Sequence, residues 1–233
     1  MMTVKVGEPR PLIWRGASKA EFMAFPVMVQ REMGYALFLA QMGERHSRAA
    51  KTLTGFGGAA VVEIRESHDR NTYRAVYATR CICAACLPEE IEEGHRDAEG
   101  GAGSDRKTLE GFDQGQGRKK MTKRPAAKDP MRNVWLQLGF PDAEEHYLKA
   151  ELVLRLDKAI QSLRLTQREA ARRIGTSQPE LSKILGGKFS EASLERLMRF
   201  LTALGCHIEI KIGVGHENKA GEVTVKDARR VAA

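Results

Sequence analysis

The sequence lacks the features of a secreted or membrane-spanning chain. None of its apolar runs approaches 18 residues, and its first residues, MMTVKVGEPRP, lack the apolar stretch of a signal peptide. Cysteine is scarce, with four residues in 233, so we expect no disulfide framework. These absences predict a cytoplasmic protein with no membrane partner.

Acidic residues are also outnumbered. The chain has 38 Lys and Arg against 30 Asp and Glu, a formal net charge of +8. An excess of cations favours a polyanionic partner such as nucleic acid, although it does not determine a fold. At 233 residues, the chain is long enough for two small domains, each with its own core.

Residues 1–80 carry the pattern of a small α+β domain. A short apolar strand is expected at 10–16, and Ser18 with Glu21 has the spacing of a capping box at a helix start. A second helix is predicted from Pro26, and two strands follow. The order strand-helix-helix-strand-strand leaves the sheet in need of one more strand.

Residues 81–132 show no sustained periodicity, and three interpretations remain open. The first is a metal site, but the spacing of its four possible ligands is not common for zinc, so we expect no metal and no other cofactor. The second is an irregular linker. The third is a frameshift: read one base later, the glutamate codons of EEIEE encode lysine or arginine, and Met121 would begin a separate protein. The four possible ligands are Cys81, Cys83, Cys86 and His95.

Residues 166–185, TQREAARRIGTSQPELSKIL, have the spacing of a helix-turn-helix motif. Thr166 and Ser177 are good N-caps, Ala171 is small where two helices cross, and Gly175 permits the turn between them. An ordinary helical hairpin with a solvated polar face is the alternative.

In such a motif the second helix enters the major groove of DNA. Gln178 can then pair with adenine, and Lys183 can reach guanine acceptors. The side chains predicted to face bases are Ser177, Gln178, Glu180, Ser182 and Lys183, and those predicted to contact phosphates are Gln167, Arg168 and Lys188.

Residues 133–213 resemble HigA-type antitoxin regulators of the Cro/repressor (XRE) family, in segments such as NVWLQLGFPDAEEHYLKAEL and SLERLMRFLTALGCHIEIKI. The resemblance implies an all-α domain over 133–214 that binds duplex operator DNA as a dimer and has a toxin partner. A strand at 207–213 could pair with its copy through an exposed edge, or pack within its own chain. The polar tail at 215–233 is expected to fray.

Residues 11–80 resemble phage-derived toxins of RelE/HigB type, in FPVMVQREMGYAL, LTGFGGA and NTYRAVY. The resemblance implies a metal-independent ribonuclease that cuts mRNA on the ribosome, with Arg74 stabilising the phosphate. Tyr73, His46 and Lys51 are further candidates, and the alternative for Arg74 is an ordinary strand arginine. The family continues with a last strand and a lysine-rich tail, which this sequence replaces from Cys81 onward.

The sequence therefore predicts a truncated α+β toxin-like domain followed by a helix-turn-helix domain. We expect a DNA-binding regulator of toxin–antitoxin type whose toxin part is inactive. The alternatives are an active ribonuclease and a purely structural role.

Overall fold

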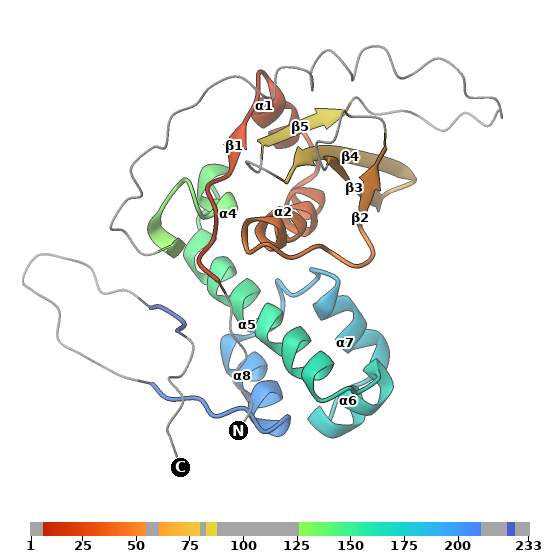
Figure 1. Cartoon of the computed structure of the whole chain (residues 1–233), viewed down its shortest axis with the longest axis vertical. Helices are drawn as coiled ribbons and strands as arrows, with labels where there is room; N and C mark the ends of the chain where they lie inside the picture. The colour runs from red at the N-terminus through yellow and green to blue at the C-terminus, as the bar shows by residue number, and fades with distance from the viewer. Residues whose placement is uncertain (1–6, 55–60, 80–82, 88–125, 211–222, 227–233) are drawn as a thin grey trace, which may run out of the picture.

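The computed structural model describes residues 7–54, 61–79, 83–87, 126–210 and 223–226. Its first part, which we call the sheet unit, is a five-stranded sheet with two helices (Figure 1). The strand order is β1-β5-β4-β3-β2; β1 pairs with β5 in parallel and the other pairs are antiparallel. The elements are β1 (Ile13–Trp14), α1 (Ser18–Met23), α2 (Val27–Gln41), β2 (Ala50–Leu53), β3 (Val61–His68), β4 (Asn71–Ala78) and β5 (Cys83–Leu87).

The sheet is not missing its last strand, so the prediction of a truncated domain was wrong in this respect. Strand β5 lies inside the region expected to be a linker, with Cys83 opposite Ala78 and Leu87 opposite Arg74. Its other edge pairs with β1, where Ile13 lies opposite Cys83. Because β5 is bonded on both edges, long-range pairing stabilises a segment whose own pattern is weak. The sequence pattern also did not predict strand β2.

The second part, which we call the helical unit, contains the predicted helix-turn-helix. Its elements are η2 (Ala126–Lys128), α4 (Val134–Gln137), α5 (Ala143–Ser162), α6 (Gln167–Ile174), α7 (Gln178–Leu185) and α8 (Leu194–Ala203). The predicted linker boundary at 132 is therefore too late, because η2 already packs on α5.

The strand predicted at 207–213 is absent from 207–210, and 211–213 lie outside the described residues. Ile208 is partly buried against the core of its own chain, whereas the side chain of Ile210 is 72% exposed. The two isoleucines therefore do not share one face, as they would in a strand at 207–213.

The two units share one continuous hydrophobic core, contrary to the expectation of two separate cores. Helix α2 lies between the sheet and the helical unit (Figure 1). The ring of Phe38 is 5.8 Å from that of Trp135 and 5.3 Å from that of Tyr147. A Cβ on Gly34 would lie 2.8 Å from the indole nitrogen of Trp135, so only glycine allows this approach.

Polar contacts reinforce the shared core. The guanidinium of Arg31 makes two bonds to the carboxylate of Asp142, at 2.9 and 3.1 Å, and lies 3.1 Å from Nδ1 of His146. The bond from Arg31 lowers the pKa of Asp142. Burial and the charge of Arg31 lower the pKa of His146 to about 4, so this ring is neutral and takes part in the apolar packing.

No helix in the described residues is long and apolar enough to cross a membrane. The same residues contain no cluster of His, Cys, Asp and Glu suited to a metal ion. Of the four possible metal ligands in 81–132, Cys81 and His95 lie outside the described residues.

Candidate nucleic-acid interface

Helices α6 and α7 form a helix-turn-helix fixed by local capping. Thr166 and Glu169 make a reciprocal capping box at the start of α6. Gly175 ends that helix with φ +73°, a left-handed conformation that favours glycine. Ser177 then caps α7 by accepting a bond from the backbone N–H of Glu180, at 3.3 Å. The helix-turn-helix predicted at 166–185 is therefore confirmed.

The exposed N-terminal end of α7 presents Gln178. Its Nε2 donates to Oε1 of Gln167 at 3.2 Å, so the first residues of both helices are linked. This bond orients the Gln178 amide before any ligand arrives and leaves its oxygen and one N–H for a partner. Arg168 on α6 and Lys183 on α7 are also exposed.

Glu180, which is predicted to face a base, has two bonding partners within the chain. Its carboxylate accepts a bond from Thr176 Oγ1 at 2.5 Å and lies 2.6 Å from Nη2 of Arg196 on α8. These two contacts lower the pKa of Glu180. Glu180 therefore links α7 to the preceding turn and to α8.

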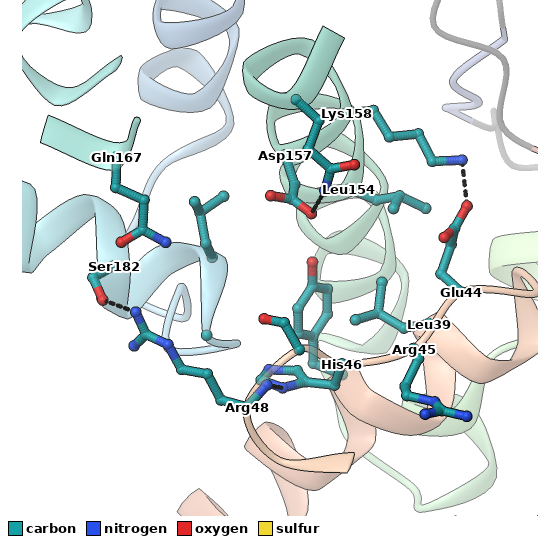
Figure 2. Close-up of a pocket in the computed structure, with 15 residues that line it drawn as sticks. Leu39, Glu44, Arg45, His46, Arg48, Leu154, Asp157, Lys158, Gln167 and Ser182 are labelled. Atoms are coloured by element: carbon teal, nitrogen blue, oxygen red, sulfur yellow. Dashed lines mark hydrogen bonds and ion pairs between the residues drawn. The ribbon is translucent and has the colours of Figure 1, made fainter. Parts of the chain in front are cut away.

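Two other residues predicted to contact DNA, Ser182 and Lys188, bond to side chains of the sheet unit. Nη2 of Arg48 donates to Oγ of Ser182 at 2.6 Å (Figure 2). The ammonium of Lys188 lies 3.1 Å from the carboxylate of Glu32 and 3.8 Å from that of Glu66. Sequence reasoning had no local signal for these contacts, because the partners are more than 100 residues away.

His46 connects the sheet unit to the end of α7. Its Nδ1 accepts bonds from the backbone N–H groups of Ala49, at 2.9 Å, and Arg48, at 3.3 Å. Burial lowers its pKa, while a hydrogen bond with the backbone of Gly186 opposes this effect. His46 is thus a buried, neutral side chain that holds the loop, and not a member of a cluster with Arg74.

The remaining predicted catalytic residues fall on both faces of the sheet. Tyr73 is buried against Phe25, with ring centroids 5.1 Å apart, on the opposite face of β4 from Arg74. Lys51 pairs in register with Glu63, and Arg65 pairs with Arg74.

One face of the sheet therefore carries three cations around a buried carboxylate. Glu63 is 6% exposed, and its carboxylate lies 3.5 Å from Nη2 of Arg65 and 3.8 Å from Nη1 of Arg74. Lys51 projects from the same face, since side chains opposite one another in an antiparallel pair point the same way. Sequence reasoning found Lys51 and Arg74 but missed Glu63 and Arg65.

The contact around Lys188 predicts a pH-dependent stability. Burial and the neighbouring carboxylate of Glu32 raise the pKa of Glu66 from 4.5 to about 7. Between these values the folded chain keeps a proton that the unfolded chain has lost, so this group's contribution to the free energy of unfolding falls as pH rises. Glu66→Gln should remove that fall.

Urea unfolding of the two proteins at pH 4.5 and 7.5 measures the effect. Relative to the unmodified chain, Glu66→Gln should become more stable as pH rises through this window. Glu191→Gln, at an exposed site outside the contact, serves as the control. A constant difference between Glu66→Gln and the unmodified chain would contradict the assignment.

Comparisons with known proteins agree with the two-part architecture. Residues 134–213 match a family described as a helix-turn-helix domain, and residues 20–84 match one described as a phage-derived, Gp49-like protein. A solved structure named "Putative XRE Family Transcriptional Regulator" is 38% identical; the match covers 38% of this chain and 100% of that chain, with a TM-score of 0.36. Among curated proteins none matches. The chain thus joins a Gp49-like, phage-derived part, in the sheet unit, to a helix-turn-helix domain, in the helical unit.

Proposed function

We propose that the chain is a sequence-specific DNA-binding regulator of toxin–antitoxin type. The observation that carries this proposal is the exposed N-terminal end of α7, where Gln178 is held by Gln167 and Lys183 lies five residues further along the helix. A helix presented in this way fits the major groove, where a glutamine amide pairs with adenine and a lysine ammonium reaches guanine. DNA binding in turn places the protein in the cytoplasm.

The resemblance to HigA-type antitoxins supports a homodimer on a palindromic operator. The exposed Ile210, within the predicted 207–213 segment, is a candidate dimer contact. A two-fold dimer would place two copies of α7 in successive major grooves, about 34 Å apart.

Equilibrium binding to DNA from the region upstream of its own gene tests the proposal. The chain should bind this duplex more tightly than a scrambled duplex of equal length. The logarithm of the binding constant should also fall linearly with the logarithm of salt concentration, by about 0.9 per phosphate contact. Equal affinity for both duplexes would contradict a sequence-specific regulator.

A second candidate function is RNA cleavage by the sheet unit, of the kind performed by RelE/HigB toxins on the ribosome. It is favoured by Lys51, Arg65 and Arg74 around the buried Glu63. The cations would stabilise charge on a scissile phosphate, and a carboxylate can accept the proton of the attacking 2′-hydroxyl. Strand β5 removes one of the two reasons for expecting inactivity, because the sheet has its last strand. The lysine-rich tail of the toxin family is still replaced in this sequence.

Cleavage of mRNA on purified ribosomes by the full chain tests this second candidate. If the chain cleaves, Arg74→Ala should slow cleavage by about 100-fold, because a donor to the phosphate is lost. Lys19→Ala, on the exposed side of α1, should cleave at the rate of the unmodified chain. Absence of cleavage would leave DNA binding as the function. Cleavage at equal rates with and without Arg74 would show that Arg74 does not stabilise the phosphate.

A further inference from the structure

We propose that the Gp49-like domain forms part of the DNA-binding surface, through a contact between Arg48 and a backbone phosphate beside α7. The inference rests on the proposed function of α7 and extends its surface to a second domain. It begins from the contact between Arg48 and Ser182, at 2.6 Å, which joins the two units at the recognition helix itself (Figure 2).

Arg48 lies on the same side of the motif as the predicted DNA contacts. Ser182 is four residues after Gln178, so the two side chains lie on one face of α7, one turn apart. Gln167, which bonds Gln178, lines the same pocket as Arg48 and Ser182. The guanidinium thus extends the row of polar groups that begins at the N-termini of α6 and α7.

The charge of Arg48 is available for a phosphate. In the part of the chain that the structure describes, no carboxylate lies within ion-pair distance of it, whereas Lys188 pairs with Glu32 and Glu66. The bond to Ser182 uses one of the five N–H donors of a guanidinium, and planar bidentate contact with phosphate suits the rest. Arg48 can therefore bind phosphate while it stays bonded to Ser182.

The loop that carries Arg48 is already fixed in place. His46 bonds the backbone N–H of Arg48 itself and contacts the backbone at Gly186. Below the loop, the ring of Tyr35 packs on that of Phe189, 5.1 Å apart. Because these contacts order the loop before DNA arrives, little conformational entropy remains to be lost on binding.

Arg45 provides a matched control on the same loop. It is exposed like Arg48 and lies on the other side of His46, but Figure 2 shows its side chain pointing away from Ser182. Removal of either arginine lowers the net charge by one. Comparison of the two variants therefore distinguishes a contact specific to Arg48 from a general loss of positive charge.

The test measures binding of the full chain to the upstream duplex and to a scrambled duplex over a range of salt. Arg48→Ala should weaken binding to both duplexes roughly tenfold at 0.1 M salt and reduce the salt slope by about one. Arg48→Lys should keep the slope, and Arg45→Ala should match the unmodified chain. Unchanged thermal unfolding of each variant shows that the shared core is intact.

Each result supports or overturns one claim. If the unmodified chain binds and Arg48→Ala binds equally well with the same slope, the composite surface is wrong and the helix-turn-helix function stands. Equal losses for Arg48→Ala and Arg45→Ala would also overturn it, as an effect of net charge alone. If the unmodified chain binds neither duplex, the proposed function and this extension both fail.

Discussion

Replacing Gln178 and Lys183 together with alanine should remove the preference of the chain for its own upstream DNA. A good side chain–base pairing contributes about 1–3 kcal/mol of discrimination, so the double change should cost about 2–6 kcal/mol with the upstream duplex. Scrambled DNA should lose much less, because its affinity comes from phosphate contacts. Both side chains are exposed, and neither is part of the shared core, so stability should change by less than about 1 kcal/mol.

Competition between labelled upstream DNA and unlabelled scrambled DNA measures this ratio directly. Arg199→Ala is a suitable control, because it removes one cation from a 69% exposed side chain on α8, away from α7. It should leave the ratio of the two affinities unchanged. A double variant that kept the ratio of the unmodified chain would show that α7 does not read sequence.

Trp135→Ala should destabilise the sheet unit as well as the helical unit to which Trp135 belongs. The side chain is fully buried against Gly34 and Phe38, both on α2 of the other unit. Truncation of a buried tryptophan to alanine costs about 3–5 kcal/mol, through lost burial and a residual cavity. Because the core is continuous, we expect one cooperative transition that is shifted as a whole.

The chain has two tryptophans, which makes this measurement simple. In Trp135→Ala the remaining Trp14, on β1, reports by fluorescence on the sheet unit and on its contact with α4, where its indole N–H donates to Gln137. Circular dichroism reports mainly on the helices. Both signals should show the same lowered urea midpoint. Val27→Ala, at a 57% exposed apolar site at the start of α2, should change the midpoint little. A Trp14 signal that kept its original midpoint would mean that the two units unfold independently.

The sequence predicted the helix-turn-helix well because its determinants are local. The capping box of Thr166 and Glu169, the left-handed Gly175 and the cap at Ser177 all act within a few residues. Strand β5 was missed because its strand state depends on partners distant in sequence, such as Trp14, which lies opposite Ala84. Periodicity within a segment carries no information about such pairing.

The same reasoning explains why the sequence did not predict the contacts of three site residues. Ser182, Lys188 and Glu180 have the positions of DNA contacts in the motif, but their bonding partners lie in other elements. One sequence signal for the shared core was available: Gly34 in the middle of α2, where a glycine marks the close approach of another group.

The aromatic contact across α2 also constrains how the two units can exist apart. A polypeptide that began at Met121 would keep the recognition helix but leave Trp135, Tyr147 and Phe189 without the rings of α2 that cover them. Such an uncovered apolar surface favours capture of a separate copy of the sheet unit. The sheet unit and the helical unit therefore have matching apolar surfaces, so we expect the two pieces to associate as separate polypeptides.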